Sequence, residues 1–437
     1  MCALLVYTVH PNWKWVVQES LASFTVNSSS IEVHCKESPR DLPSQGQIGV
    51  DKEEQFNEGM RETGKSKRHL RRQKYAYALF RYEFVCTEAA TATVMKSDAW
   101  ATSLAFANLD AKDDLYRALT RANAAHLMPT TYLLPYDLTS IEDMPEKLPS
   151  SPCSILKAAL GSGGDCLFFV TSKSVILSII VEHKKKAETF PGFLESLVKD
   201  YGAVPAWSLQ AYYYPLCIDW LGKRRRSQFR VYAVYSQQPK RAIYIYKQVE
   251  VRLPEWNVDL DNLLSNATNC LSGDDGCKSD LGTSRPYNEE RNKALTDRVT
   301  MMEISRHLES ELMLQDGGCA QLQNKIVSHV ANAMHALREH IAINTSSHAP
   351  SYRASPSSFP ALGMLPRNEV AVVGVDIILS SVGVPYILEF NNNPAMPQQH
   401  KQMSDAYREH LITLVTCMRE LVCNHSKEDS FFAVNID

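Results

Sequence analysis

Two apolar segments near the end of the chain each carry a carboxylate, and this pattern constrains the fold more than any other. The segments span residues 372–379 and 386–392. Asp376 lies in the first, Glu389 and Asn391 lie in the second, and a short turn containing Gly383 separates them. Such a turn between two apolar runs predicts a β-hairpin. Because strand side chains alternate between two faces, Glu389 and Asn391 point the same way, and Asp376 can lie beside them on the neighbouring strand.

This hairpin presents oxygen ligands from rigid elements. Carboxylate and amide oxygens such as those of Asp376, Glu389 and Asn391 are the ligands that Mg²⁺ prefers, usually together with the phosphates of a nucleotide. The alternative is a buried hairpin whose polar residues have no role. That alternative is weaker, because unpaired carboxylates are costly to bury in apolar strands. The hairpin therefore predicts a Mg²⁺–nucleotide site.

A lysine and a glycine-rich loop lie upstream, between two more strand-like runs. Lys157 ends the first run, and residues 167–170 form the second. The loop between them contains Gly161, Ser162, Gly163 and Gly164. Glycines let backbone N–H groups approach phosphate oxygens, and a lysine adds a point charge. The loop lacks the Gly-Lys-Ser/Thr ending of a Walker motif, and an ordinary hairpin loop is the alternative. Its place before the carboxylate hairpin favours phosphate binding.

Further segments follow a fixed order along the chain. Gln210 and Tyr212 lie in an aromatic run that ends at Pro215, which alone could be a core strand. Residues 227–235 alternate with period two and contain Arg230. The remaining polar positions of interest are Lys112 in a Leu-rich segment, Lys247, Arg252, and Asn266 in a Leu-Ser-Asn sequence.

In this order the segments resemble the tubulin–tyrosine ligase family. The resemblance extends from the strand-like residues 3–7 to residues 431–435, apart from polar insertions. It implies an α/β (α+β) protein with an ATP-grasp fold and a small α/β N-terminal domain. It also implies ATP and Mg²⁺ as cofactors.

The resemblance assigns a role to each motif. The implied nucleotide contacts are Lys112, Lys157, Gly161, Ser162, Gly163, Gly164, Gln210, Tyr212 and Asn266, with Gln210 and Tyr212 beside the adenine. Arg230 would be catalytic and would stabilise the phosphoryl and tetrahedral oxyanions. Lys247 and Arg252 would bind substrate carboxylates. The implied metal ligands are Asp376, Glu389 and Asn391.

Several positions depart from the family pattern. Gln228 replaces an Asp before the arginine, Lys247 replaces an Arg, and Leu263 replaces a His. Ala211 stands where a Lys is usual, and Gly163 and Cys166 alter the phosphate loop. The metal trio and both phosphate lysines are intact, which favours an active enzyme over a dead relative.

The chain is expected to divide into three parts. Residues 1–108 form the predicted N-terminal domain, with a polar insertion at 36–61. Residues 109–210 form a central ATP-grasp subdomain with the phosphate loop, and 211–437 form the catalytic subdomain. Polar stretches at 271–292 and 344–360 read as loops near the site. Apolar residues at helical spacing predict helices around 322–337 and 407–421.

Composition agrees with a globular protein that works in the cytoplasm. The chain has 437 residues, of which 44% are hydrophobic, enough for a large core. Its eleven scattered cysteines suggest reduced thiols. We expect neither a signal peptide, since no basic region precedes the first apolar run, nor a membrane segment, since no run approaches roughly 20 apolar residues.

Charge bears on the partners. A net charge of −3 argues against nucleic acid as a partner. Basic residues nevertheless cluster at 65–74, at 184–186 and at 223–226. Such runs are often only solvated surface, but the family resemblance implies that they attract the acidic C-terminal tail of tubulin. We expect a monomer or a complex with the tubulin dimer, and an association with microtubules.

The resemblance implies ATP-dependent peptide-bond formation with a free amino acid as second substrate. Three possibilities stay open. The first is addition of tyrosine to detyrosinated α-tubulin through an acyl phosphate. The second is addition of glutamate or glycine to tubulin or another protein by the same nucleotide site. The third is a catalytically dead module that binds tubulin without ATP.

Overall fold

The structure is a computed structural model. It describes residues 2–8, 15–16, 19, 32–35, 77–86, 94–101, 105–106, 108–149, 154–158, 167–188, 206–237, 240–253, 297–315, 317–346, 368–392, 394, 403–424 and 428–436. The predicted phosphate loop, Asn266, the insertion at 36–61 and the basic cluster at 65–74 lie outside the described residues.

In the described part of the chain, eleven strands form one large sheet. They are β1 (Cys2–Thr8), β2 (Glu32–Cys35), β3 (Tyr77–Cys86), β4 (Val94–Ala101), β11 (Gln228–Ser236), β12 (Ala242–Tyr246), β13 (Glu250–Leu253), β14 (Asp297–Thr300), β15 (Asn368–Leu379), β16 (Pro385–Asn392) and β17 (Phe431–Asn435). The pairs β1–β2 and β4–β15 are parallel, and the others are antiparallel.

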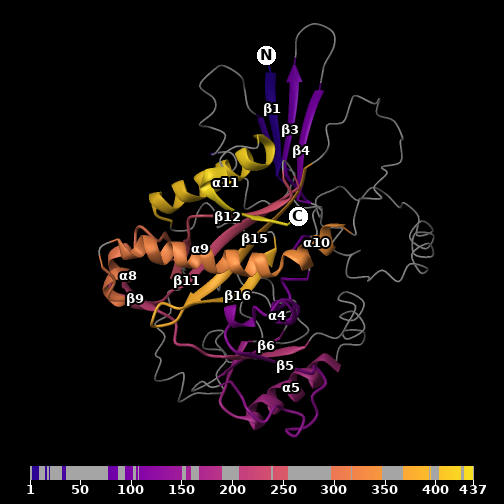
Figure 1. The fold of residues 1–437 in the computed structure, drawn as a ribbon, viewed down its shortest axis with the longest axis vertical. Helices are drawn as coiled ribbons and strands as arrows, with labels where there is room; N and C mark the ends of the chain where they lie inside the picture. Colours follow the sequence, from indigo (N-terminus) through magenta and orange to yellow (C-terminus); the bar gives the residue numbers. More distant parts are fainter. Residues whose placement is uncertain are drawn as a thin grey trace, which may run out of the picture.

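Strands β11 and β15 form the centre of this sheet. They pair along eight residues, from Phe229 opposite Ile377 to Ser236 opposite Val370. On its other edge β11 pairs with β12 and with β13, and β15 pairs with β16 and with β4. The strands of the predicted N-terminal domain therefore join the large sheet through β4 (Figure 1).

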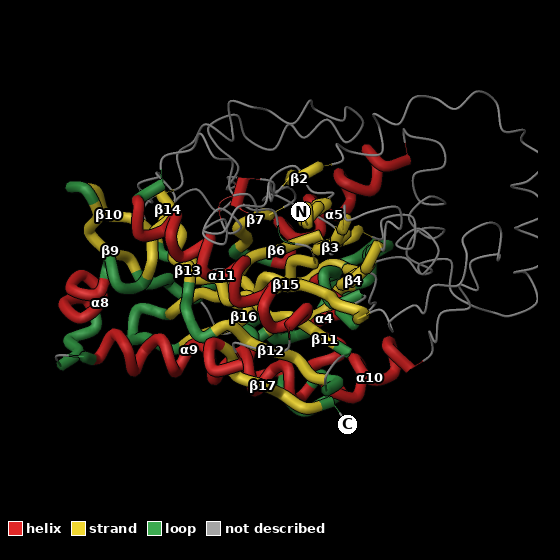
Figure 2. Tube along the Cα trace, turned by 90° about the horizontal axis from the view of Figure 1, so that it is seen from above, coloured by secondary structure: helices red, strands yellow, loops and turns green. Residues whose placement is uncertain are grey.

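Helices cover both faces of the large sheet, because its apolar residues alternate along the strands (Figure 2). Val231 and Ala233 belong to the core with α8 (Ser305–Glu311), α9 (Gly318–Ala336) and α10 (Arg338–Ser346). Tyr232 and Val234 belong to the opposite core, with α11 (Asp405–Asn424). The helices predicted around 322–337 and 407–421 are thus confirmed.

A smaller antiparallel sheet has the strand order β5-β8-β6-β7. Its strands are β5 (Thr131–Leu134), β6 (Ser154–Ala158), β7 (Leu167–Val170) and β8 (Trp207–Ala211). Helix α5 (Lys173–Glu188) packs on one face through a core that includes Leu156, Ile176 and Leu209. Helix α4 (Lys112–Arg121) contacts both β8 and β16 and so lies between the two sheets (Figure 1).

Short elements complete the description. They are the hairpin of β9 (Cys217–Trp220) with β10 (Lys223–Arg226), and the 3-10 helices η4 (Ala125–Leu127) and η6 (Glu428–Ser430). The polar stretch predicted to begin at Asn344 begins too early, because α10 continues to Ser346. Asn344 is buried there, and its amide donates to the carbonyl of Ala105 at 3.4 Å.

The described residues form an α+β protein, in agreement with the coarse fold class expected from the sequence. The four strands of the small sheet lie between Thr131 and Ala211, inside or next to the predicted central part. The predicted boundaries at 108 and 210 stay predictions. Within the described residues, no helix combines the length and the apolar character that crossing a membrane requires.

Candidate functional site

The hairpin of β15 and β16 brings the predicted carboxylates together. Asp376 lies opposite Glu389, and Gly374 lies opposite Asn391. The register shifts between Asp376 and Ile377, so Leu388 is an extra residue in β16 next to Glu389. Bulges of this kind are common beside functional sites, where they redirect a side chain. Gly383 has φ +74 in the turn, as a left-handed turn position favours glycine.

The same cross-strand row continues through two more strands. Arg230 on β11 lies opposite Asp376 on one side and opposite Glu250 of β13 on the other. Residues directly opposite in antiparallel strands share a face of the sheet. Glu250, Arg230, Asp376 and Glu389 therefore form one row of charged side chains across four adjacent strands.

Arg230 and Asp376 form a buried, two-bonded ion pair. Arg230 Nε donates to Asp376 Oδ1 at 2.5 Å, and Arg230 Nη2 donates to Oδ2 at 2.8 Å. Burial alone would raise the pKa of Asp376, but Arg230 and Arg252 hold that pKa below its usual range. A Cβ at Gly374 would lie 3.1 Å from Arg230 Cδ, so the glycine leaves room for this side chain.

Glu250 is the centre of a second ionic cluster, which the sequence analysis missed. Its side chain accepts hydrogen bonds from Arg252 Nε at 2.6 Å, Arg298 Nη1 at 3.3 Å and Tyr232 Oη at 2.7 Å. Burial would raise the pKa of Glu250, but Arg252, Arg298 and Arg230 hold the pKa well below its usual range. The available signal was one acidic residue in the apolar run 249–253.

The two predicted phosphate lysines reach this row from the other side. Lys112 is the first residue of α4, and its Nζ lies 3.5 Å from Glu389 Oε2. Lys157 Nζ on β6 donates to Gln210 Oε1 on β8 at 2.6 Å. Gln210 Nε2 in turn donates to Thr131 Oγ1 on β5 at 3.1 Å. These bonds orient Lys157 on the face of the small sheet opposite α5.

Lys157 lies close enough to the row to interact with it. Burial lowers the pKa of Lys157 to about 8, Glu389 partly opposes this shift, and Lys112 adds to it. A lysine in this setting is a cation that lacks a directly bonded anion among the described residues. Binding of an anion beside it would restore the missing partner.

Positive charge exceeds negative charge in the site. The cationic side chains are Lys112, Lys157, Arg230, Arg252 and Arg298, and the carboxylates are Glu250, Asp376 and Glu389. Formal charges leave an excess of two positive charges among these described residues. A partly enclosed cluster of this sign suits a ligand with several negative charges, such as a polyphosphate.

The predicted metal trio fits Mg²⁺ in part. Asn391 Nδ2 donates to Asp376 Oδ2 at 3.0 Å and to Glu389 Oε1 at 3.4 Å, so the three side chains do converge. Glu389 is about one third exposed and is the carboxylate best placed to accept a cation, whereas both oxygens of Asp376 are shared with Arg230. No group of three His, Cys, Asp or Glu side chains suited to a metal occurs in the part of the chain described. Mg²⁺ needs fewer, because it usually keeps phosphate and water ligands.

Two predicted substrate or base contacts have different surroundings. Lys247 is exposed, and its Nζ donates to the carbonyl of Asp429 at 2.7 Å, so no described contact joins it to the charged row. Tyr212 is buried and packs edge-on against Phe169, with ring centroids 5.1 Å apart. Tyr212 therefore packs next to Ile155, on the face of the small sheet that also carries Lys157.

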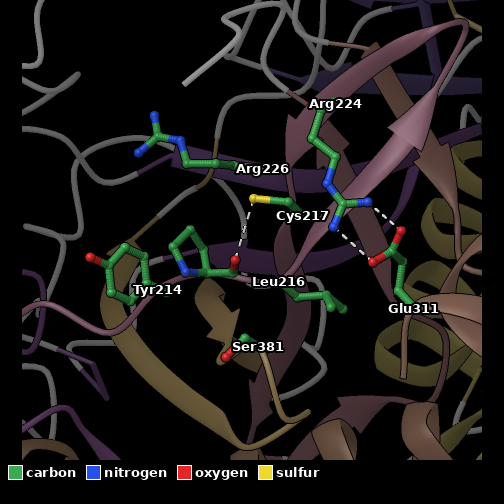
Figure 3. Close-up of a pocket in the computed structure, with 8 residues that line it drawn as sticks. Tyr214, Leu216, Cys217, Arg224, Arg226, Glu311 and Ser381 are labelled. Carbon is green, nitrogen blue, oxygen red and sulfur yellow. Dashed lines mark hydrogen bonds and ion pairs between the residues drawn. The ribbon is translucent and has the colours of Figure 1, made fainter. Parts of the chain in front are cut away.

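The segment that follows Tyr212 in the chain lines a pocket of about 310 Å³. It is lined by Tyr214, Pro215, Leu216, Cys217, Arg224, Arg226, Glu311 and Ser381 (Figure 3). The connecting segment is fixed to the turn after β15, since Leu216 N donates to the Leu379 carbonyl and Ser381 N to that of Tyr214. Arg226 precedes Arg230 by four residues of extended chain, roughly 13 Å.

The basic run 223–226 is not a continuous exposed track. Arg225 is buried, and its Nη1 donates to Asp297 Oδ2 at 2.7 Å. Arg224 forms a two-bonded pair with Glu311 of α8. Along β10, Lys223 and Arg224 are exposed, Arg225 is buried and Arg226 is half-buried, so Arg224 and Arg225 hold neighbouring elements together. Reversing the charge of Arg224 or Arg225 would test these structural pairs rather than capture of an acidic tail.

Comparisons of the sequence with protein-family models and with curated proteins give no match.

The buried charge of Lys157 gives a prediction about stability. Its pKa is about 8 in the folded protein and near 10.5 when exposed, so the unfolded chain binds more protons between these values. Burial of this charge therefore costs stability below about pH 8, and the cost disappears as pH rises toward 10.5. We expect Lys157→Met to raise the free energy of unfolding at pH 7 by on the order of 1–3 kcal/mol.

The measurement is urea unfolding of both proteins from pH 7 to pH 10.5. The difference between them should shrink as pH rises. Lys185→Met on the exposed side of α5 controls for general loss of a positive charge. A constant difference across this range would contradict the buried, charged state of Lys157.

Proposed function

We propose that this chain is an ATP-dependent carboxylate–amine ligase with an ATP-grasp arrangement, related to the tubulin–tyrosine ligases. One observation carries the proposal. Lys112 and Lys157, from the part of the chain around the small sheet, meet the row of Arg230, Asp376 and Glu389 on the large sheet. Two sheets that present cations and carboxylates to the same space suit a nucleotide held between them.

The polyphosphate end of ATP would lie at Lys112 and Lys157. The excess of positive charge there supports four negative charges arriving with a bound cation. The base would lie toward the segment after β8, beside Tyr212 and the pocket at Tyr214 and Leu216. Gln210 fits a different role from the one expected of it. Its side chain bridges Lys157 and Thr131, so it orients the phosphate lysine.

Mg²⁺, when bound at Glu389 and Asn391, would supply positive charge to the phosphoryl oxygens. The chain's own residues do the rest. Lys157 and Lys112 neutralise phosphate charge and fix its position. Arg230 presents a planar guanidinium, held by Asp376, to oxygens that gain charge in the transition state. Arg252 lies next to Asp376, at 3.8 Å, where it can bind the carboxylate that reacts.

The reaction has two steps. A carboxylate oxygen of the acceptor attacks the γ-phosphorus of ATP. The bond between this phosphorus and the β–γ bridging oxygen breaks, which gives an acyl phosphate and ADP. The amine of an amino acid then attacks the acyl carbon, loses a proton, and displaces inorganic phosphate. Both steps place developing negative charge on oxygens near Arg230 and the lysines, so positioning and electrostatic stabilisation supply most of the catalysis.

The identity of the acceptor rests on the family resemblance. We propose the C-terminal tail of tubulin as acceptor and tyrosine as the amino acid, with glutamate or glycine ligation as the alternative. A few pocket contacts decide between amino acids. The departure at Gln228 falls on β11 opposite Arg252, next to the site, and is consistent with a changed substrate preference.

The decisive experiment is incubation of the purified protein with tubulin, ATP and Mg²⁺, and each labelled amino acid in turn. Label in tubulin that depends on ATP identifies the amino acid. ADP release without any labelled product would retain the nucleotide site and reject tubulin as acceptor. Absence of both would reject the ligase and favour a binding module.

Nucleotide binding gives a separate prediction. A ligand that binds only the folded protein raises its melting temperature. We expect ATP with Mg²⁺ at millimolar concentration to raise the melting temperature of the wild type, and the increase to shrink in Lys157→Ala. Lys185→Ala is the matched control, because that side chain is exposed on α5. No increase in the wild type would count against an ATP site.

A further inference from the structure

Glu250 is a fully buried carboxylate beside the proposed site, and none of the reaction steps above uses it. It lies in the same cross-strand row as Arg230 and Asp376. On one side Glu250 lies opposite Arg230 of β11, and on the other it lies opposite Thr300 of β14. Two residues further along β13, Arg252 lies opposite Arg298 of β14. A carboxylate in such a position has to serve the arginines around it.

The oxygens of Glu250 are already occupied. Oε1 accepts from Arg252 Nε at 2.6 Å and from Arg298 Nη1 at 3.3 Å, and Oε2 accepts from Tyr232 Oη at 2.7 Å. With no exposed surface and all these donors, Glu250 is shielded from a ligand, a metal ion or a substrate proton. Any effect that it has on a bound molecule must pass through another residue.

Arg252 is the residue through which Glu250 can act. Its Nε is fixed by Glu250, and its Nη1 lies 3.8 Å from Asp376 Oδ2. Its Nη2 is buried and has no hydrogen-bond partner among the described residues. A guanidinium whose Nε is anchored and whose Nη2 is unpaired is prepared to bind an anion, because little side-chain freedom remains to be lost, and 12% of this side chain stays exposed.

We propose that Glu250 is a positioning residue that fixes the guanidinium of Arg252 so that its exposed part faces the reacting carboxylate of the acceptor. The carboxylate in this statement rests on the ligase function proposed above. Arg298 and Tyr232 hold Glu250 from two other directions, so its orientation is itself fixed. The chain thereby places an arginine next to Asp376 without pairing it fully to that carboxylate.

The competing explanation is that Glu250 only balances the charge of three arginines. The two explanations give opposite results for carboxylate binding. Removal of a negative charge makes the site more positive, so pure charge balance predicts tighter binding of a carboxylate. Loss of a positioning contact predicts weaker binding, because Arg252 can then turn away from the ligand.

The test uses Glu250→Gln and Glu250→Asp in the full chain. Binding is measured by fluorescence anisotropy with a labelled glutamate-rich peptide that ends in a free carboxylate, and with the same peptide amidated at its C-terminus. Inorganic phosphate serves as a competitor. We expect the wild type to prefer the free acid and both variants to bind it more weakly, on the order of tenfold. In turnover assays the KM for the acceptor should rise while the KM for ATP changes little.

Each outcome is decisive. Tighter or unchanged binding in Glu250→Gln, or wild-type binding in Glu250→Asp, would overturn the positioning role. Equal affinity of the wild type for the free and the amidated peptide would also overturn it. The same holds if phosphate displaces both peptides but the free C-terminal carboxylate adds no affinity. Glu303→Gln is the control, since that carboxylate bonds to Thr300 and not to Arg252.

The double variant Glu250→Gln/Arg298→Gln serves as a control for net charge, because it removes one charge of each sign. Its peptide affinity should stay low although the charge balance is restored, and recovery of affinity would favour charge balance instead. The peptide measurements need no catalysis. If ATP and Mg²⁺ fail to bind while the peptide results hold, the ligase proposal fails and the Glu250–Arg252 inference survives.

Discussion

Replacement of Glu389 by Gln is expected to reduce ATP-dependent turnover by about 10³-fold, while the fold is retained. Glu389 is the carboxylate of the row with the most exposed side chain, and the cation that would accompany ATP has no better placed ligand among the described residues. Loss of its charge weakens the binding of that cation. It also removes an ion-pair partner of Lys112, whose Nζ lies 3.5 Å from Glu389 Oε2. About 4 kcal/mol of lost transition-state stabilisation corresponds to this decrease in rate.

The measurement is initial velocity at saturating ATP and Mg²⁺, together with thermal unfolding. Stability should change little, because the ion pair of a carboxylate that is about one third exposed contributes at most about 1 kcal/mol. Asp219→Asn is the matched control, since Asp219 is an exposed carboxylate on β9 that pairs with Arg224. A variant that turns over as fast as the wild type would remove Glu389 from the proposed site.

The carboxylate hairpin could be predicted from sequence because its determinants are local. Gly383 marks the turn, and side-chain alternation then fixes which residues share a face. Asp376, Glu389 and Asn391 follow directly from that geometry. Arg230 could be included because residues 227–235 alternate with period two and resemble the arginine-containing strand of the family.

The Glu250 cluster could not be predicted in the same way. Arg298 joins it only through the pairing of β13 with β14, which are separated by more than forty residues of chain. Sequence patterns give the faces of a strand but not which distant strand lies next to it. The single acidic residue in an apolar run marks a buried ion pair in general, without naming the partner.

Two other expectations were limited by the same difficulty. Lys247 was assigned by the family resemblance and the run 223–226 by its charge, and neither says whether a side chain is already paired. Lys247 bonds to a backbone carbonyl of η6, and Arg225 bonds to Asp297. In each case the partner lies far away in sequence. By contrast Lys112 and Lys157 were predicted from their places in ordered motifs, and the structure brings both near Glu389.

The Arg230–Asp376 pair joins stability to the proposed chemistry, and this gives the second large effect. Arg230 is 5% exposed and Asp376 is 2% exposed, so neither charge has much access to water. Removal of one partner of a buried pair leaves the other charge uncompensated, at a cost of about 3–5 kcal/mol. We therefore expect Arg230→Met to lower the free energy of unfolding by about 3–5 kcal/mol at pH 7.

The pH dependence of this loss identifies its cause. In the wild type the pKa of Asp376 is held low, so the pair contributes fully above the unfolded value of 3.8 and is lost as pH falls below it. Without Arg230, burial becomes dominant and raises the pKa of Asp376, although Arg252 at 3.8 Å offsets part of that rise. The variant then takes up a proton on folding. The amount by which its free energy of unfolding falls short of the wild type should therefore shrink as pH falls from 7 toward 4.

A double variant separates the structural effect from the catalytic one. Arg230→Met/Asp376→Leu replaces the pair by apolar side chains, and such replacements are often neutral for stability. We expect most of the lost stability to return, while ligation stays absent in both the single and the double variant. Urea unfolding at pH 7 and pH 4.5, run beside ADP release, measures both properties. Restored turnover in the double variant would mean that the pair only supports the fold, and Arg230 would then have no part in the transfer of the phosphoryl group.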